Sequence, residues 1–567
     1  MPMLCLRRMS SKALGSSVVF VLLSMVVCTP PEDPITCSSE NTSCTITNSY
    51  GMFPDRSICH VAKVLYPTTE QELVSVVASA TKNKTKMKVA TLKIDVEART
   101  MTVVSGVTMK QLINEAAKAG LALPYAPYWW GLTIGGLMGT GAHGSTLWGK
   151  GSSVHDYVVG LTLVRPAPPQ DGYAKLETLT QQHQDLDAAK VSLGVLGVIS
   201  QVRGTISPSF PTFFFNMITL KLEPLFKRSI TYLAKDDSDL GEQVTSFGHA
   251  HEFADITWYP SHRKALYRVD HRVPINTSGN GLYDFIPFRP TPSLGLALIR
   301  TTEDIQESTR DADGKCISSK TTTNTLVTAA YGLTNNGILF SGYPVIGFQN
   351  RLQASGSCLD SLQDAKITTC AWDSRVKGEF FHQTTFSISL SVVKNFIEDV
   401  QKLVELEPKA LCGIELYNGI LMRYVKASSA YLGKQEDALD FDITYYRSKD
   451  PLTPRLYEDI LEEVEQIGIF KYGGLPHWGK NRNLAFVGAI KKYKNAEYFL
   501  RVKDKYDSQG LFSSTWTDQV LGLKDGMTIL KDGCALEGLC ICSQDTHCNP
   551  TKGYYCRPGK VYKEARQ

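Results

Sequence analysis

The stretch TIGGLMGTGAHGSTLWGKGSS, residues 133–153, constrains the fold more than any other part of the chain. Glycine occupies seven of its 21 positions, and one histidine, His143, lies among them. Glycine costs conformational entropy, but it allows left-handed backbone and close approach of the chain to a ligand. We therefore expect a loop whose N–H groups line a flat, polar, anionic ligand.

A dinucleotide fingerprint of the Rossmann type is the first alternative for these glycines. That motif needs a strand directly before it, a helix directly after it and an acidic residue about twenty positions on. Here PYAPYWWGLT precedes the glycines, and HGSTLWGKGSS behind them is too rich in Gly and Ser to begin a helix. The pattern favours a long turn between two strands. Taken alone, His143 fits a core histidine bonded to a carbonyl better than a ligand contact.

The N-terminus has the pattern of a secretory signal peptide. Arg7 and Arg8 precede a largely apolar run of ten residues, Val18 to Val27, and Thr29-Pro30-Pro31 follows. We expect cleavage near Cys28, so that residues 1–28 are a signal peptide. Ten residues cannot cross a bilayer, and no later run of about 18 exists, so a soluble secreted protein is expected. An uncleaved membrane anchor is the alternative.

The cysteines are consistent with export. Twelve of the 14 lie beyond residue 28, at positions 37, 44, 59, 316, 358, 370, 412, 534, 540, 542, 548 and 556. In an oxidising compartment they are expected to pair, although the tail spacing would also suit zinc. Five fall in the last 34 residues, so at least one of these pairs outside the tail or stays free. Sequons at Asn41, Asn83 and Asn276 predict N-glycosylation.

The texture of the chain predicts an α+β protein of several parts. The first part, residues 29–207, should carry strands at 101–107 and 156–164, with helices capped by Thr69–Glu72 and Thr108–Gln111. The second part, 208–525, should carry a strand at 386–393 and a helix. The buried face of that helix is expected to hold Phe396, Ile397, Val400, Leu403 and Val404. Residues 526–567 form a cysteine-rich tail. A net charge of +4 with no Lys/Arg run gives no footprint for nucleic acid, and no metal site is expected.

Several separated motifs resemble the p-cresol methylhydroxylase-type (PCMH-type) FAD-binding fold, also called the vanillyl-alcohol oxidase fold. GGLMGTGAHGS is similar to its second flavin loop, and SLGVLGVIS is similar to the segment that closes over the adenine. LPHWGK resembles the HWxK signature of the sugar-1,4-lactone oxidases, and YDSQGLF their D-P-x-G-x-F turn, with Ser508 for Pro. Together with NSYGMFPDRSICHVAKVLYPTTEQEL and the tail, these motifs identify the chain as a member of the plant L-gulonolactone oxidase-like proteins. The implied cofactor-binding residues are Gly135, Gly136, Gly139, Thr140, Gly141, His143, Gly144, Ser145, Gly194, Gly197 and Ile199.

The resemblance implies a two-domain FAD oxidase: a PCMH-type FAD-binding domain at 29–207 and an α+β substrate (cap) domain at 208–525. The implied reaction converts L-gulono-1,4-lactone and O2 to L-ascorbate and H2O2. Lys480 and His477 stand in the HWxK motif and are the expected catalytic residues, with Arg423 beside them. Relatives carry Glu-x-Arg on that strand, but Leu421 occupies the glutamate position here, and Glu415 is the doubtful substitute. The resemblance leaves the oligomeric state open.

One departure from the family concerns the first flavin loop. Relatives carry R-x-S-H-S after the strand that Met87–Ala90 matches, whereas here KVAT continues directly into LKIDVEART. The loop that would hold the pyrophosphate is therefore missing between Thr91 and Leu92. Two alternatives stay open: another carbohydrate oxidase or dehydrogenase on the same fold, or a non-catalytic chain that binds a sugar or a partner without flavin.

Overall fold

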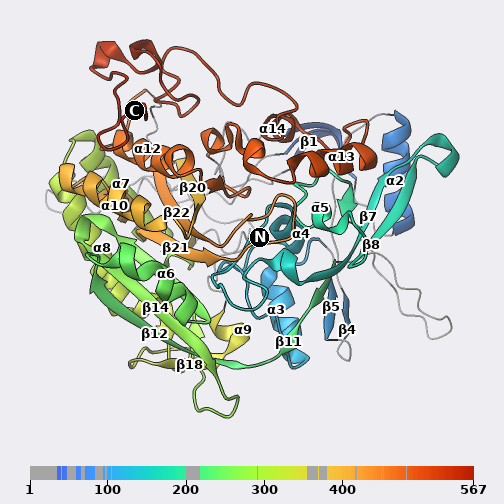
Figure 1. The fold of residues 1–567 in the computed structure, drawn as a ribbon, viewed down its shortest axis with the longest axis horizontal. Coiled ribbons are helices and arrows are strands. Elements are labelled where there is room, and N and C mark those ends of the chain that lie inside the picture. The colour runs from blue at the N-terminus through green and yellow to red at the C-terminus, as the bar shows by residue number, and fades with distance from the viewer. Residues whose placement is uncertain are drawn as a thin grey trace, which may run out of the picture.

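The computed structural model describes residues 35–39, 41–46, 59–65, 70–83, 93–95, 99–103, 105–199, 218–289, 291–353, 368–369, 380–415, 418–447, 450, 452–480 and 482–567. Two sheets form its frame, and helices cover them on the outside (Figure 1). The predicted signal peptide, the predicted boundary at 207/208, the junction at 91/92, and Cys358 and Cys370 lie outside the described residues.

The first sheet has the strand order β4-β5-β10-β7-β8, with β9 added to β7, and all its pairs are antiparallel. Its strands are β4 (Lys93–Asp95), β5 (Thr100–Val103), β7 (Val158–Pro166), β8 (Ala174–Thr180), β9 (Val198–Ile199) and β10 (Ile218–Lys221). The strands predicted at 101–107 and 156–164 are confirmed as β5 and β7, each shifted by about two residues or shortened. The strands β6 (Leu121–Ala122) and β11 (Glu223–Pro224) form a separate antiparallel pair.

Helices α2 (Glu70–Asn83) and α3 (Met109–Lys118) pack with this sheet. The predicted capping box of α3 is confirmed, because the Gln111 amide N–H donates to Thr108 Oγ1 and the Thr108 N–H donates to the Gln111 side chain. Leu112, Ile113 and Ala116 on one face of α3 are buried. The proposed cap of α2 at Thr69 lies outside the described residues, and the helix begins at Glu70.

The glycine-rich stretch departs from the long turn that we expected. It contains a short helix, α4 (Ile134–Gly139), and a 3-10 turn at Val154–Tyr157 that leads into β7. The Gly136 N–H donates to the side chain of Thr133, and three apolar side chains of α4 are buried, so capping and burial outweigh the low helix propensity of its glycines. Residues 140–153 remain irregular.

The second sheet has eight antiparallel strands in the order β18-β12-β14-β13-β21-β22-β20-β23. They are β12 (Lys227–Asp236), β13 (Phe253–Tyr259), β14 (Lys264–Val273), β18 (Val345–Phe348), β20 (Phe380–Ser389), β21 (Ile420–Val425), β22 (Ala438–Arg447) and β23 (Leu475–Pro476). The strand predicted at 386–393 is confirmed in part, since β20 begins earlier and ends at Ser389.

The two faces of this sheet differ in chemistry. On one face, residues such as Ile256, Met422 and Phe441 are fully buried. They form the second core together with α10 (Val393–Leu406) and α6 (Leu240–Ala250). The five residues predicted for the buried face of α10 are all buried. Because side chains alternate along a strand, the opposite face carries the polar residues of the same strands. That polar face is where the candidate site lies.

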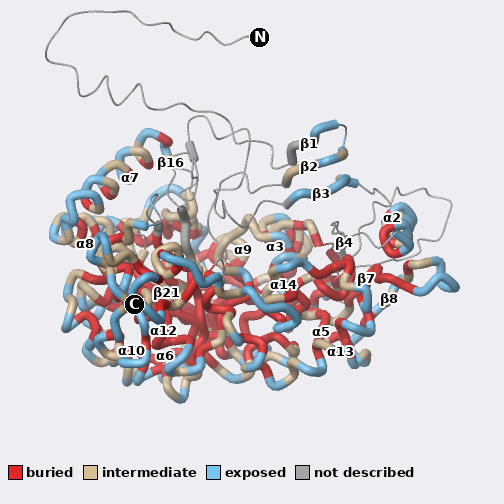
Figure 2. Tube along the Cα trace, turned by 90° about the horizontal axis from the view of Figure 1, so that it is seen from above, coloured by how far each residue is buried: buried red, intermediate tan, exposed pale blue. Residues whose placement is uncertain are grey.

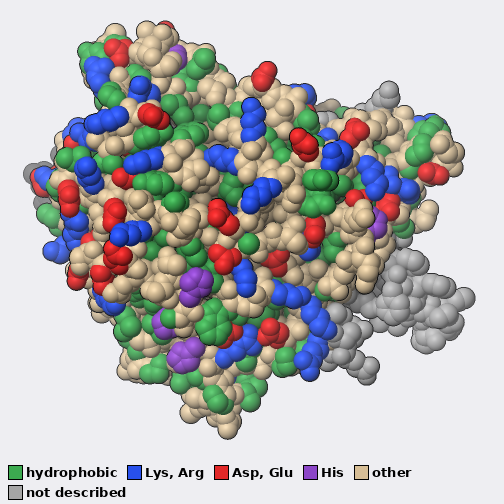
Figure 3. Space-filling model, in the orientation of Figure 1, with side chains coloured by type: hydrophobic (Ala, Val, Ile, Leu, Met, Phe, Trp, Pro, Cys, Tyr) green, Lys and Arg blue, Asp and Glu red, His purple; other side chains and the backbone are tan. Residues whose placement is uncertain are grey.

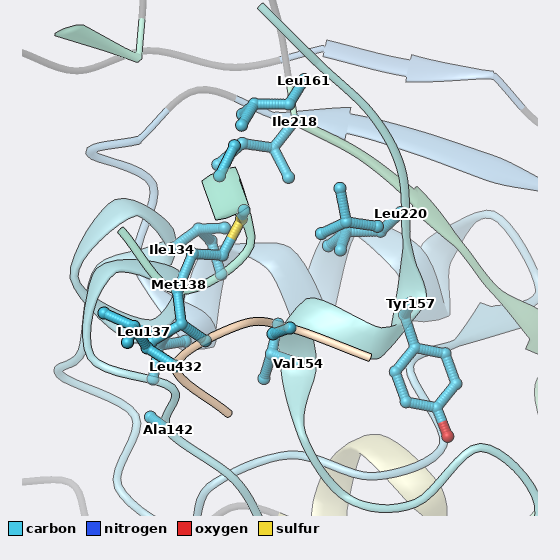
Figure 4. Close-up of a cluster of buried hydrophobic side chains, with 14 of the residues drawn as sticks. Ile134, Leu137, Met138, Ala142, Val154, Tyr157, Leu161, Ile218, Leu220 and Leu432 are labelled. Atoms are coloured by element: carbon cyan, nitrogen blue, oxygen red, sulfur yellow. The ribbon is translucent and has the colours of Figure 1, made fainter. Parts of the chain in front are cut away.

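The C-terminal third returns to the first sheet. We call the buried cluster around Met101 of the first sheet the first core, and it includes Trp478, Phe486, Phe499 and Leu521. This region also contains α13 (Ala496–Tyr506) and α14 (Thr515–Val520). Figure 4 shows Leu432, from beyond β21, packed among side chains of the glycine stretch and the first sheet. In Figure 2 the buried residues fill one continuous body, from which α2, α7 (Ser293–Ser308) and the strands β1–β3 project.

Disulfides close the peripheral parts. The strands β1 (Ile35–Ser39), β2 (Thr42–Ile46) and β3 (Cys59–Lys63) form a small sheet with a Cys37–Cys44 bond. Cys316 of α8 (Ala312–Thr328) bonds Cys412 of α11 (Cys412–Glu415).

The remaining α-helices and strands are α5 (Leu186–Ala189), α9 (Gln349–Leu352), α12 (Glu458–Gln466) and the pairs β15 (Leu282–Tyr283) with β17 (Leu333–Thr334) and β16 (Thr291–Pro292) with β19 (Thr368–Thr369).

The cysteine-rich tail is a disulfide module. Cys534 bonds Cys540, and Cys542 bonds Cys556, while the buried Cys548 has no disulfide partner among the described residues. His547 lies beside the first pair, but both sulfurs there are already bonded to each other. The carboxylate of Glu463 on α12 accepts the backbone N–H groups of Lys560, Val561 and Tyr562, which fixes the tail to the second core. Disulfides, rather than the alternative zinc site, therefore organise these four cysteines.

Charge is mixed over the surface. Lys and Arg side chains alternate with Asp and Glu across the face seen in Figure 3. Within the described part of the chain, none of the helices combines the length and apolar character that crossing a bilayer requires.

Candidate functional site

The two glycine segments predicted to hold the cofactor lie together. The Leu193 N–H donates to the Gly139 carbonyl, with N and O 2.9 Å apart. A Cβ placed on Gly139 would have Gly194 N as its nearest neighbour, at 4.0 Å, so there is space beside this half-buried residue. Gly141, Gly194 and Gly197 have φ values of +67°, +72° and +141°, which only glycine adopts freely. This junction is the part of the glycine stretch that is open to a ligand.

Other predicted cofactor residues hold the protein itself together. A Cβ on Gly135 would lie 2.5 Å from Ser105 Cβ, and one on Gly144 would lie 2.5 Å from the Ala126 carbonyl oxygen. Ser145 Oγ accepts the Tyr424 N–H at 2.8 Å, which ties the glycine stretch to β21. Thr140 Oγ1 donates to the Gly136 carbonyl, and the carbonyl of Ile199 accepts the Ser105 hydroxyl.

His143 connects the glycine stretch to the polar face of the second sheet. It is buried, and its Nε2 lies 2.7 Å from Oδ2 of Asp440 on β22. Asp440 also contacts Lys434 Nζ at 3.5 Å and the hydroxyl of Ser387. Burial lowers the pKa of His143, although Asp440 acts against this shift. Burial alone would raise the pKa of Asp440, but the charges of Lys434 and His143 hold it well below its usual value.

Asp442, two residues further along β22, forms ion pairs with the two predicted catalytic cations, Arg423 and Lys480. Its Oδ2 lies 3.1 Å from Arg423 Nη2, and its Oδ1 lies 3.6 Å from Lys480 Nζ. Arg423 Nη1 also donates to the His143 carbonyl at 3.1 Å. The structure thus brings Arg423, Lys480 and His143 together at one place, although they come from three distant parts of the sequence.

The HWxK turn is positioned by its tryptophan and by the strand before it. Trp478 is buried, stacks on Phe486 at 5.6 Å between ring centres, and donates its Nε1–H to the Leu432 carbonyl. The His477 N–H donates to the Thr385 carbonyl on β20 at 2.9 Å. With Trp478 fixed in the first core, His477 and Lys480 lie beside the polar face.

His477 is a neutral imidazole that can donate from Nε2. Its ring centre lies 5.4 Å from that of His143, and its Nδ1 accepts the Gly479 N–H at 3.0 Å, which places the proton of the neutral ring on Nε2. Burial lowers the pKa of His477 well below its usual value, and the charges of His143 and Lys480 act in the same direction. A Cβ on Gly479 would lie 3.2 Å from Thr140 Oγ1, so this turn also lies against the glycine stretch.

The pKa values of Lys480 and Asp442 depend on each other's charge. Burial lowers the pKa of Lys480, Asp442 opposes this shift, and Arg423 adds to it. Burial would raise the pKa of Asp442, but Lys480 and Arg423 outweigh it and lower that pKa below its usual value. Arg423 Nε is buried and has no hydrogen-bond partner in the described part of the chain, which leaves a donor for a bound group.

The sequence alone missed Asp440, Asp442 and Lys434. A signal was present, because ALDFDITYYR alternates carboxylates with apolar residues, and Leu439, Phe441 and Ile443 are indeed buried. Leu421, in the position of the relatives' glutamate, faces Asp442 directly across β21 and β22. Glu415 ends α11, and its side chain lies outside the described residues.

FAD fits the described part of this site in two respects. There is space beside the half-buried Gly139 where the two glycine segments meet, and Arg423 Nε offers a donor without a partner among the described residues. Only nine residues separate α2 from β4, and no R-x-S-H-S sequence occurs in the chain. The donors that the first flavin loop would add are therefore missing from the sequence.

Three regions of the chain match known protein families, and full-length relatives cover nearly all of it. Residues 85–167 match the family described as FAD binding domain, residues 357–520 match D-arabinono-1,4-lactone oxidase, and residues 531–567 match the C-terminal domain of L-gulonolactone oxidase 2-like proteins. L-gulonolactone oxidase 2 of Arabidopsis thaliana is 60% identical over 582 aligned residues, which cover 97% of this chain and 96% of the relative. L-gulonolactone oxidase 5 of the same plant is 58% identical, with 98% and 96% covered.

The alignment with L-gulonolactone oxidase 2, at 582 positions, is longer than this 567-residue chain. That relative therefore carries residues that have no counterpart in this chain.

Solved structures agree on the fold. A solvent-stable cholesterol oxidase superimposes with a TM-score of 0.60 at 15% identity, covering 87% of this chain and all of the other. The Bermuda grass isoallergen BG60 gives 0.51 at 12% identity, with 88% and 98% covered. With the PCMH-type fold, the FAD-binding and lactone-oxidase regions and full-length relatives in agreement, the chain belongs to the L-gulonolactone oxidase family of FAD-dependent sugar-lactone oxidases.

Proposed function

We propose that the protein oxidises L-gulono-1,4-lactone with O2 and produces L-ascorbate and H2O2. The names of the full-length relatives support the lactone, and one structural observation carries the chemistry. Arg423 and Lys480 flank the Asp442 carboxylate beside the neutral imidazole of His477, next to the glycine segments. This arrangement suits stabilisation of the negative charge that develops on the lactone's hydroxyl oxygen as its proton leaves.

Each side chain has a role that follows from its charge. The lactone binds against the polar face, where Arg423 and Lys480 attract its hydroxyl oxygen. His477, neutral and protonated on Nε2, donates that N–H to the hydroxyl oxygen, and the hydroxyl proton passes to solvent. The cations stabilise negative charge on that oxygen as the proton leaves. Bound FAD would supply the hydride acceptor for the carbon that carries this hydroxyl, and O2 would then take up the two electrons.

The decisive experiment is an assay of the purified full-length chain, supplemented with FAD, for lactone-dependent H2O2. Bound flavin is checked from its absorbance near 450 nm, and ascorbate is identified in the product mixture. A chain that holds FAD but gives neither flavin bleaching nor H2O2 with this lactone would contradict the proposal.

The identity of the sugar is a separate question. The match of residues 357–520 to D-arabinono-1,4-lactone oxidase favours that lactone as the second candidate substrate. The two lactones are separated by comparing kcat/KM in the same preparation. Repeating the assay without O2 and with an artificial electron acceptor distinguishes an oxidase from a dehydrogenase.

We also propose that the protein enters the secretory pathway. The signal pattern, the disulfides and an exposed Asn276 support this route. Intact-mass analysis should find an N-terminus after Cys28 and glycans at Asn41, Asn83 and Asn276. An N-terminus before Val18 with all three asparagines unmodified would exclude it.

A further inference from the structure

Asp442 occupies the centre of the polar face. It lies on β22, with Leu421 of β21 opposite on one side and Thr385 of β20 opposite on the other. Leu421 brings no polar group, so the carboxylate beside Arg423 and Lys480 comes from the neighbouring strand. The side chain of Asp442 is 11% exposed, which leaves little contact with water to stabilise its charge.

Four donors from three segments converge on this carboxylate. Oδ1 accepts the Thr385 hydroxyl at 2.6 Å and the Gln383 side-chain amide at 2.9 Å, and it faces Lys480 Nζ at 3.6 Å. Oδ2 accepts Arg423 Nη2 at 3.1 Å. Oδ1 already accepts two hydrogen bonds, which use both of its lone-pair sites. Lys480 and Arg423 hold the pKa of Asp442 below its usual value, so a role as the proton-accepting base is unsuited to it.

We propose that Asp442 is the positioning residue of this site, and that its carboxylate holds the Lys480 ammonium and the Arg423 guanidinium side by side in charged form. This inference rests on the proposed function for its catalytic meaning, because the two cations then act together on the lactone oxygen. Asp442 itself does not touch the substrate. Its effect reaches the reaction through Lys480 and Arg423.

The physical reason is that two buried cations destabilise each other unless an anion lies between them. Lys480 is faced by Asp442 and Arg423, by Asp440 two residues earlier on β22, and by the neutral imidazole of His477, whose pKa the charge of Lys480 lowers. Arginine keeps its proton, so the lysine is the group that yields. When Asp442 is made neutral, Lys480 should lose its proton at a lower pH, and the site should lose two charges instead of one.

The test measures the protonation of Lys480 in the full-length chain, without need of flavin or turnover. Trace acetylation with acetic anhydride is carried out from pH 6 to pH 11, and the peptide containing Lys480 is quantified by mass spectrometry. Only the neutral amine reacts, so the midpoint of the reaction reports the pKa of that lysine. In Asp442→Asn the midpoint should move down by about one to three pH units, the usual effect of a charge at this distance.

Asp440→Asn is the matched control, since Asp440 lies on the same face of the same strand but contacts Lys434 and His143. It should move the midpoint of Lys434 more than that of Lys480. Arg423→Gln supplies an independent arm that does not require the Asp442 variant to fold, and it should move the midpoint of Lys480 upward. An unchanged Lys480 midpoint in folded Asp442→Asn, or equal shifts in both aspartate variants, would overturn the proposal.

The outcomes also separate this inference from the proposed function. A shifted Lys480 midpoint in a protein that oxidises no lactone supports the positioning role and contradicts the function. Lactone oxidation with an unshifted midpoint does the reverse. In a flavin-loaded preparation, Asp442→Asn should shift the pH profile of flavin reduction by lactone in the same direction as the acetylation midpoint.

Discussion

The imidazole of His143 and the carboxylate of Asp440 meet at 2.7 Å across 297 positions of sequence. One belongs to the glycine stretch and the other to β22 of the second sheet, so this contact joins the glycine stretch to the polar face. Both side chains are fully buried. The position of the glycine segments relative to Arg423 and Lys480 therefore depends on a charged contact that water does not screen.

Removing Asp440 should be strongly destabilising. Asp440→Ala leaves Lys434 buried without its counter-charge and His143 without its hydrogen-bond partner, and breaking a buried pair in this way typically costs about 3–5 kcal/mol. Urea unfolding should show the loss as a lower midpoint at similar slope. Glu436→Gln, at an exposed neighbouring position, serves as the control and should change stability little. Equal stabilities of the two variants would show that the buried contact contributes nothing.

Lys480→Ala should slow flavin reduction by the lactone by about 10²–10³-fold, because a charge acting on the transition state is lost. Flavin content should fall far less. Stopped-flow absorbance near 450 nm measures the rate in a flavin-loaded preparation, and Lys491→Ala, an exposed lysine nearby, is the control. An unchanged rate would show that the HWxK lysine has no part in the chemistry.

His155 should make the fold sensitive to acid. It is buried against Ser428, with Nε2 and Oγ 2.9 Å apart, and burial lowers the pKa of His155 to about 3. Between pH 6.5 and pH 3 the unfolded chain binds a proton that the folded chain excludes, so stability is complete above pH 6.5 and falls as the pH drops.

Within that window, this one group should cost about 1.4 kcal/mol for each pH unit. His155→Gln should therefore lose stability less steeply than the natural chain between pH 6 and pH 4, measured by urea unfolding at each pH. Parallel curves for the two proteins would mean that His155 is protonated in the folded state.

FAD should bind this chain weakly and without a covalent histidyl link. Two glycine segments remain, but the donors of the first flavin loop are missing from the sequence between Thr91 and Leu92, and each charged hydrogen bond lost is worth about 1.5–3 kcal/mol. Oxidase activity should be low for the same reason. Titration with FAD, followed by absorbance and by thermal unfolding, measures the affinity.

Insertion of an R-x-S-H-S loop and its strand after Ala90 should restore yellow colour and thermal stability together. At a thousandfold excess over Kd, a bound cofactor adds about 4 kcal/mol to stability. Stoichiometric flavin in the natural chain, with H2O2 formed from the lactone, would contradict this interpretation of the gap.

Much of this architecture could be predicted because its signals are local. The capping box of α3 and the apolar stripe of α10 depend only on residues within one or two helical turns, and both are confirmed. The helix α4 was missed because burial of three side chains outweighed glycine propensity, and burial depends on distant segments. Tertiary contacts decided the outcome there.

The site shows the same division. The glycine segments and the HWxK turn could be found as motifs, whereas Asp442 could not be paired with Arg423 until the register of β21 and β22 was known. The carboxylate beside Arg423 comes from Asp442 on the neighbouring strand, because position 421 holds a leucine. No spacing within one segment could show this. Sequence patterns identify side chains along one strand, but not their neighbours across a sheet.

The burial of Trp478, Phe486, Phe499 and Leu521 in the first core affects how the protein is made. During synthesis the eight strands of the second sheet are all available once Pro476 has left the ribosome, while the first core still lacks these side chains. The segment that begins the chain must wait for the segment that nearly ends it. We expect the substrate side to fold first, the reverse of the N-terminal-first order usual in multidomain proteins, and the glycine stretch to reach its final position only as the last hundred residues emerge.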